Sequence, residues 1–170
     1  MMIKKKNPNT HTISVFVANK PGVLVRCAQV FARRGFNIDS LVVSAGVDPR
    51  YSRMTITATG APEVLEQIIK QSSKLVDVMH CIEHTGEDSI DREYAMLKIK
   101  CPNPATRNAI RKLVKNRAHI LNDASGAIII GQAGRTEDLD GLEEAIKKKF
   151  TILEMVRSGK LAMAVGKEAT

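Results

Sequence analysis

Two short polar clusters near the start of the chain carry the residue types from which an amino-acid site could be built. The first is Asn19-Lys20-Pro21-Gly22, which leads directly into an amphipathic pattern, and the second is Asn37 with Ile38. A glycine turn that opens a helix presents free backbone N–H groups and the positive end of the helix dipole, which together suit a carboxylate. Gly22 also lets a ligand come close to the main chain, and an asparagine amide can accept from an ammonium group or donate to a carboxylate.

The expected position of these residues follows from the strands on either side of them. Asn19 ends one predicted strand and Asn37 begins another, and we expect both at the same edge of the folded unit. In a simpler interpretation Asn19 and Pro21-Gly22 only form a turn, and Asn37 only begins a strand. Physical chemistry alone favours this simpler interpretation, because turn residues of these types need no ligand to explain them.

Other motifs argue against catalysis. His80 and His84 would lie about 13 Å apart on a strand, whereas imidazoles that share a zinc ion hold their nitrogens about 2.1 Å from it, so we expect no metal there. The run from Gly126 to Gln132 has the glycine spacing of a phosphate loop but lacks the lysine, and we predict a buried strand instead. Neither a nucleophile elbow nor a dinucleotide fingerprint occurs in the sequence. We therefore expect a non-catalytic chain without a cofactor or metal of its own.

The composition indicates a globular protein of the cytoplasm. Apolar residues make up 44% and charged residues 26% of the 170 positions. No apolar run approaches the roughly 18 to 20 residues of a membrane helix, and no apolar segment follows the lysines near the N-terminus as in a secretory signal. The three cysteines form no close pair, which fits a reducing compartment. We expect no membrane contact.

The net charge of +8 raises the question of a nucleic-acid partner. The positive residues are dispersed, and those in a last helical turn are explained by the helix dipole. An RNA-binding sheet presents aromatic side chains for base stacking, whereas the predicted central strands show Ile13, Val15, Met54 and Ile56, with only Phe16 as a candidate. We therefore expect no nucleic-acid partner.

The apolar periodicity predicts an α+β fold of two tandem ferredoxin-like βαββαβ units, each with two helices on one face of a four-stranded antiparallel sheet. In the first unit we expect strands at 12–18, 37–47, 52–59 and 76–82, with helices at 23–34 and from Pro62 onward. In the second we expect strands at 94–101, 120–123, 127–131 and 150–156, with helices at 104–115 and from Thr136 to Lys149. The polar segment 85–91 is the predicted linker. The predicted domains are residues 10–85 and 92–166.

Several stretches closely resemble the regulatory (small) subunits of acetolactate synthase, also called acetohydroxyacid synthase. The resemblance lies in residues 19–24, 33–41, 48–49, 52–56, 74–78, 92–99 and 154–159. The string from Arg34 to Ser40 is specific, because a generic amino-acid-binding domain would share the Pro-Gly turn but not this run. Between Cys101 and Phe150 the likeness is limited, so the roles expected of the second unit are dimer support and partner contact, without assigned residues.

The resemblance implies an ACT domain at residues 10–85 that dimerises side by side and binds valine between two copies. The N–H groups of Gly22, Val23 and Leu24 would hold the carboxylate, with Asn19 beside them. Two residues of the other copy, Asn37 and Ile38, would complete the site.

The resemblance also implies a role in branched-chain amino-acid biosynthesis. The chain would activate a catalytic subunit that carries thiamine diphosphate, magnesium and FAD, and would confer feedback inhibition by valine. It would be a non-catalytic part of a transferase holoenzyme. The alternative is a stand-alone ACT-type sensor that acts on another partner; as a transcriptional regulator it would need a DNA-reading segment, and no helix-turn-helix stretch is apparent.

Overall fold

The computed structural model describes residues 9–84 and 88–166, which form two compact units. Among the described residues, 9–84, 88–91 and 159–166 belong to the first unit, and 92–158 belong to the second.

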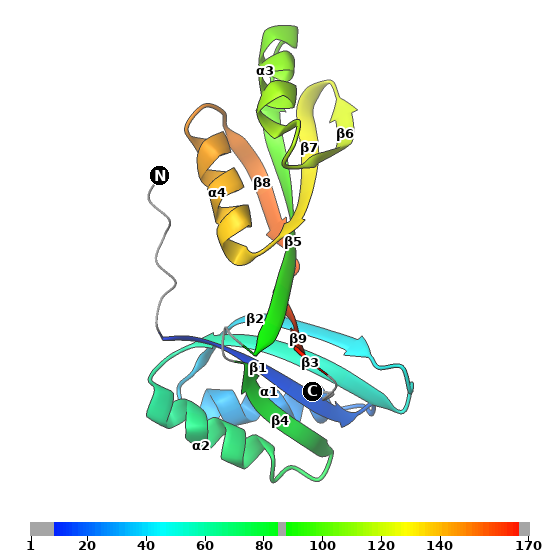
Figure 1. Cartoon of the computed structure of the whole chain (residues 1–170), viewed down its shortest axis with the longest axis vertical. Helices are drawn as coiled ribbons and strands as arrows, with labels where there is room; N and C mark the ends of the chain where they lie inside the picture. Colours follow the sequence, from blue (N-terminus) through cyan, green and yellow to red (C-terminus); the bar gives the residue numbers. More distant parts are fainter. Residues whose placement is uncertain (1–8, 85–87, 167–170) are drawn as a thin grey trace. The chain divides into compact units, whose positions relative to one another are not determined.

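The first unit has the predicted βαββαβ order. Its elements are β1 (Thr10–Ala18), α1 (Val23–Arg33), β2 (Asn37–Ala45), β3 (Tyr51–Thr59), α2 (Pro62–Ser72) and β4 (Val78–His84). The strand order is β2-β3-β1-β4 with all neighbours antiparallel, and α1 and α2 lie on the same face of this sheet (Figure 1).

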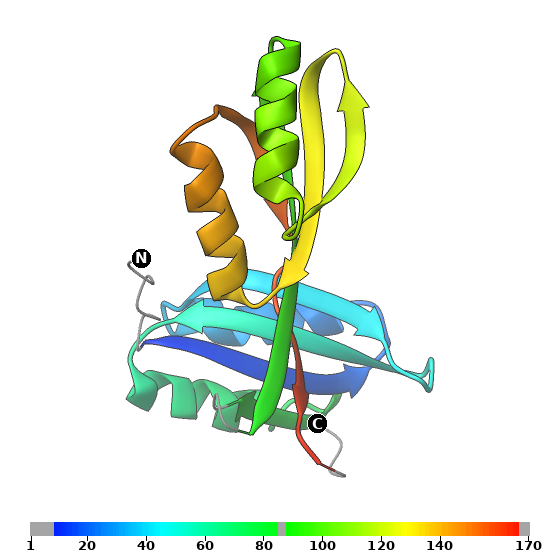
Figure 2. The ribbon, with the colours of Figure 1, turned by 45° about the horizontal axis from the view of Figure 1, so that its top comes forward.

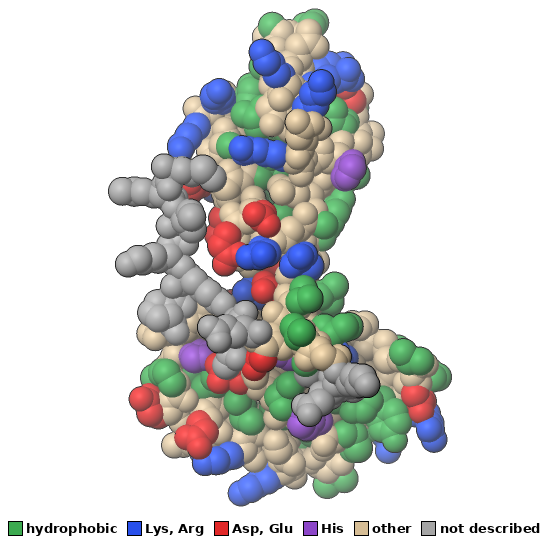
Figure 3. All heavy atoms as spheres, in the orientation of Figure 1, with side chains coloured by type: hydrophobic (Ala, Val, Ile, Leu, Met, Phe, Trp, Pro, Cys, Tyr) green, Lys and Arg blue, Asp and Glu red, His purple; other side chains and the backbone are tan. Residues whose placement is uncertain are grey.

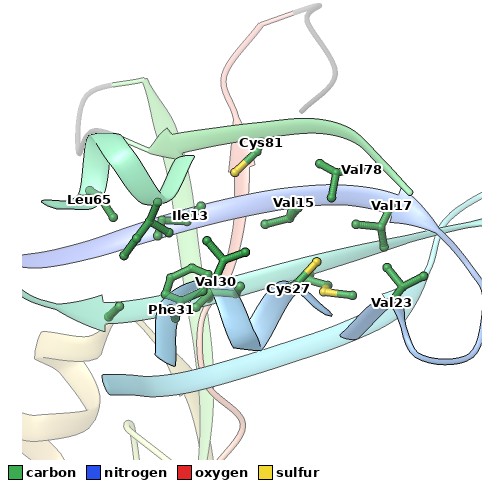
Figure 4. Close-up of a cluster of buried hydrophobic side chains, with 14 residues drawn as sticks. Ile13, Val15, Val17, Val23, Cys27, Val30, Phe31, Leu65, Val78 and Cys81 are labelled. Atoms are coloured by element: carbon green, nitrogen blue, oxygen red, sulfur yellow. The ribbon is translucent and has the colours of Figure 1, made fainter. Parts of the chain in front are cut away.

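The apolar alternation of the strands and the apolar stripes of the helices build one core between them. Ile13, Val15 and Val17 of β1 are at most 1% exposed, and they face Cys27 and Phe31 of α1 (Figure 4). Each fully buried side chain of this size stabilises the fold by about 1.5 to 3 kcal/mol relative to exposure. This packing fixes the position of α1, and with it the loop that precedes α1.

The opposite face of the first sheet is also covered, which the sequence did not predict. Ser14, Thr55 and Thr57 point away from the helices and are nevertheless buried. Strand β9 (Leu161–Ala164) crosses this face (Figure 2) and pairs with β5 (Ser89–Cys101). The backbone N–H of Val165 donates to the carbonyl of Asp88 at 2.8 Å.

Part of the predicted linker is therefore wrong. Residues 85–87 lie outside the described residues, but Ser89 to Asp91 belong to β5, which runs for 13 residues. Polar residues at 88–91 concealed this strand, because they alternate with only one large apolar side chain, Ile90.

The second unit repeats the arrangement with β5, α3 (Pro104–Val114), β6 (His119–Ala124), β7 (Gly126–Gly134), α4 (Thr136–Lys147) and β8 (Ile152–Arg157). The antiparallel order β6-β7-β5-β8 is that of the first sheet. Ile128 and Ile130 of β7 are fully buried, so the glycine run from Gly126 is a core strand, as predicted. The predicted fold class, tandem ferredoxin-like units, is confirmed.

Candidate functional site

The loop between β1 and α1 presents an open helix N-terminus. Gly22 occupies the N-cap position of α1 with a φ of 82°, a left-handed conformation that glycine adopts at little cost. No side chain of the described residues caps the helix, and its first turn contains no acidic residue. Within the described part of the chain, the N–H groups of Gly22 and Leu24 find no acceptor, and that of Val23 makes only a long 3.4 Å contact with the carbonyl of Lys20. These donors and the helix dipole favour an anion.

A guanidinium group paired with a carboxylate lies beside this loop. Arg26 lies one turn into α1, and its Nη1 atom would be 3.0 Å from a Cβ placed on Gly22. Its Nη2 atom donates to Oδ2 of Asp77 at 2.5 Å, which holds the group beside the loop. Arg26 was not among the site residues predicted from the sequence, and only its four-residue spacing from Gly22 could have suggested this contact. Asp77 is 51 residues away in the chain, so the sequence offered no signal for the pair.

Asn19 joins this loop to the turn between β2 and β3. Its backbone N–H donates to the carbonyl of Arg50 at 2.8 Å, and its Nδ2 donates to the carbonyl of Pro49 at 3.0 Å. The Oδ1 atom of Asn19 is left as the acceptor that could meet a ligand's ammonium group. Asn19 therefore has a structural role in addition to any role in binding.

Asn37 and Ile38 lie at the other end of the sheet. Asn37 pairs with Thr59, and Thr59 pairs with Thr10, the first residue of β1, whereas Asn19 follows the last residue of β1. A nine-residue strand spans about 30 Å. The expectation that Asn19 and Asn37 share one edge is wrong within one chain, because β1 and β2 run parallel on either side of β3.

The start of β2 has its own polar arrangement. Asn37 is exposed, and its Nδ2 donates to Oδ1 of Asp39 at 3.1 Å, while Thr59 donates to Oδ2 of the same carboxylate at 2.7 Å. The pairing register shifts between Ile38 and Ser40, and Ile38 is half-buried against the core. One chain thus holds two separated groups of the predicted residues, Asn19 to Leu24 and Asn37 with Ile38.

The histidine cluster has a structural explanation. The Nε2 atom of His84 and the hydroxyl of Ser14 are 2.7 Å apart in a buried position, and burial lowers the pKa of this histidine. Burial raises the pKa of the neighbouring Cys81 thiol to about 12, which keeps it protonated and unreactive. No group of three or more metal-ligating side chains occurs in residues 9–84 and 88–166. No helix among these residues is long and apolar enough to cross a membrane.

Comparisons with known proteins agree across both units. Residues 13–80 match the family described as "AHAS small subunit-like ACT domain", and residues 92–166 match "Small subunit of acetolactate synthase". The chain is 40% identical over 157 residues to a probable acetolactate synthase small subunit of Archaeoglobus fulgidus, covering 92% of this chain and 97% of that one. It is 36% identical over 157 residues to the acetolactate synthase small subunit of Haemophilus influenzae, covering 92% and 96%.

A solved structure shows the same architecture. The crystal structure of the acetolactate synthase small subunit from Thermotoga maritima superposes with a TM-score of 0.81 at 31% sequence identity. The match covers 94% of this chain and 99% of that one, so both βαββαβ units are included.

Proposed function

Because the chain belongs to the family of acetolactate synthase small subunits, we propose that it activates the catalytic subunit and makes it sensitive to feedback inhibition by valine. The catalytic subunit supplies the chemistry in this proposal, together with thiamine diphosphate, magnesium and FAD. The chain itself supplies the effector site.

The valine carboxylate binds the N–H groups of Gly22, Val23 and Leu24 in this proposal, beside the guanidinium of Arg26. The three backbone donors support this placement, since hydrogen bonds to a charged group are the stronger ones, and Nη1 of Arg26 is a further donor beside them. Oδ1 of Asn19 accepts from the ammonium group.

The other copy of the chain supplies Asn37 and Ile38, and the geometry of β2 is the observation that carries this step. Among residues 9–84 and 88–166, strand β2 pairs only with β3, and its other edge is open and suited to strand addition. Two β2 edges related by a two-fold axis must pair antiparallel. The start of one β2 then lies beside the end of the other, at the sheet end where the partner's Gly22 loop is found. The two groups of residues, which lie far apart within one chain, therefore come together across the proposed dimer.

Residues 10–85 serve in this proposal as the effector-binding and dimerisation domain. Residues 92–166 support the dimer and contact the catalytic subunit. The segment from Gly159 packs against the first unit, where a Cβ on Gly159 would lie 3.1 Å from Ser40 and from Val42 of β2. Gly159 therefore lies beside β2, the strand through which the dimer is proposed to form.

The mechanism is a linkage between effector binding and dimer arrangement. Valine that bridges two copies favours the arrangement in which the site is closed, and it shifts the equilibrium only by its difference in affinity for the two arrangements. If the closed arrangement supports the catalytic subunit less well, valine inhibits the holoenzyme.

The test is to purify the chain with the acetolactate synthase catalytic subunit of its host and to assay pyruvate condensation with and without valine. We expect higher activity when the chain is added, and inhibition of that activity by valine. The absence of both effects would refute the proposal.

A further inference from the structure

We propose that the tip of the β2–β3 hairpin, residues 46–50, is the surface through which the effector site acts on the catalytic subunit. This inference rests on the proposed function and assigns the output surface of the same site.

The first step is the direct hydrogen bonding between the effector loop and the hairpin tip. The backbone N–H of Asn19 donates to the carbonyl of Arg50 at 2.8 Å, and its Nδ2 donates to the carbonyl of Pro49 at 3.0 Å. A ligand that donates a hydrogen bond to Oδ1 of Asn19 therefore contacts the same residue whose backbone N–H and Nδ2 bind the hairpin tip. Ligand and tip share this one side chain.

The second step is the rigidity of the tip. The N–H of Gly46 donates to the carbonyl of Tyr51 at 2.9 Å, and the N–H of Tyr51 donates to the carbonyl of Asp48 at 3.0 Å. The carboxylate of Asp48 accepts from the backbone N–H and the guanidinium of Arg50 at 2.6 to 3.0 Å. The ring of Tyr51 stacks on Phe16 of β1 with centroids 5.2 Å apart. A turn fixed in this way moves as one body with the end of β1.

The third step concerns what the tip presents. Val47 is fully exposed at 108%, and the neighbouring charges of Asp48 and Arg50 form an internal ion pair. Figure 3 shows hydrophobic, acidic and basic side chains together at this tip, at the lower right. The tip thus presents one apolar side chain beside two charged ones.

The register of the strands favours the catalytic subunit as the occupant. The last paired residues of β2 and β3 are Ala45 and Ser52, so residues 46–50 project beyond the end of the sheet. Pairing of two β2 edges uses residues within the strands and leaves the tip outside them. The tip therefore lies outside the proposed dimer contact, and the family's designation as the small subunit of acetolactate synthase points to a catalytic subunit as its partner.

Two variants test the surface. Val47→Asn removes the exposed apolar side chain, and Val76→Asn is the matched control, since Val76 is 93% exposed in the same unit and lies before β4. With the full chain and the catalytic subunit, we expect Val47→Asn to weaken their association about tenfold or more. Valine binding to the isolated chain and its dimeric state should remain unchanged, and Val76→Asn should behave as the wild type.

The outcomes separate this inference from the proposed function. Unchanged affinity of Val47→Asn for the catalytic subunit would overturn the inference, and so would dissociation of its dimer, which would assign the tip to a second copy. If the wild type binds no valine but Val47→Asn no longer binds the catalytic subunit, the proposed effector role is refuted and the assignment of residues 46–50 as the contact surface is supported.

Hydrogen exchange tests the coupling step. Saturating valine should slow amide exchange of Gly46 and Tyr51 in the wild type, although neither residue belongs to the proposed valine site. Exchange that does not change at these two amides would overturn the coupling between effector loop and tip.

Discussion

Replacing Gly22 by aspartate places a negative charge where the effector's carboxylate is proposed to bind. The left-handed conformation at φ 82° costs an ordinary residue about 1 to 2 kcal/mol, and asparagine and aspartate tolerate it better than most. The added Cβ would lie 3.0 Å from Nη1 of Arg26, the flexible end of a long side chain that can move away. Gly22→Asn carries nearly the same shape without the charge, so the two variants differ only in electrostatics.

The charge effect can be estimated from the distance between two carboxylates. Two negative charges about 4 Å apart repel by about 1 kcal/mol in bulk water and by about 4 kcal/mol near a protein surface. Gly22 is exposed, so the effect falls within this interval. Valine should therefore bind Gly22→Asp about fivefold to 700-fold more weakly than Gly22→Asn.

The assays are calorimetric binding of valine to the purified chain and the valine midpoint for inhibition of the holoenzyme. Gly126→Asp is the control, because Gly126 has a φ of 84° in the second unit and a Cβ there would meet nothing within 4 Å. It should lower the stability of its own unit by a comparable amount and leave the valine midpoint unchanged. Equal valine affinities for Gly22→Asp and Gly22→Asn would refute the carboxylate assignment.

Three further predictions concern the dimer, the core and the pH dependence. Co-expression of a Gly22→Asp chain with an Asn37→His chain should restore part of the valine inhibition that each variant lacks alone, because the mixed dimer contains one site with both halves intact. Gly60→Ala should destabilise the first unit by about 1 to 3 kcal/mol in chemical denaturation, because its Cβ would lie 2.2 Å from the ring of Phe36. His84→Gln should flatten the loss of urea resistance between about pH 7.5 and about pH 5.5. Burial lowers the pKa of His84 in the folded chain, so the unfolded chain binds the proton more readily and stability falls as the pH falls through the unfolded value of about 6.5.

Each of these has its own control and contrary result. No recovery of inhibition in the mixed dimers would place both halves of the site in one chain. Gly141→Ala, in α4 with open space around its Cβ, should stabilise by about 1 kcal/mol, whereas Gly60→Ala should be rescued by shortening Phe36 to leucine. Equal pH dependence in wild type and His84→Gln would show that other groups, such as carboxylates, account for the acid sensitivity.

The sequence predicts the helices and the central strands of both units because their core faces follow a strict period. β1 alternates between buried Ile13, Val15 and Val17 and polar or half-buried neighbours, and α1 buries Cys27 and Phe31 at helical spacing. Strand β9 was not predicted, because its buried positions carry small or charged residues and its larger apolar residues are exposed. Its own Ala162 and the preceding Lys160 are buried against the first sheet, while the larger Leu161 and Met163 are exposed.

The glycine turn and the helix start could be read from the sequence, since both are local. The contacts that complete the candidate site are not local. Arg26 meets Asp77 across 51 residues, and Asn19 meets Pro49 across 30. The apolar periodicity of the sequence cannot predict such pairs, because they depend on the order of strands in the sheet and on the loops that this order brings together.

The directions of β1 and β2 determine how an effector could contact both Gly22 and Asn37. Two strands that are both antiparallel to β3 run in the same direction, so the end of β1 and the start of β2 must lie at opposite ends of the sheet. An effector that needs Gly22 and Asn37 together can then bind only across two copies. By reciprocity, such an effector must strengthen the dimer by the same free energy by which dimerisation strengthens its binding. In the proposed dimer, effector sensitivity and assembly are therefore a single equilibrium, and a variant that weakens the β2 edge should lose valine response even when both halves of the site are intact.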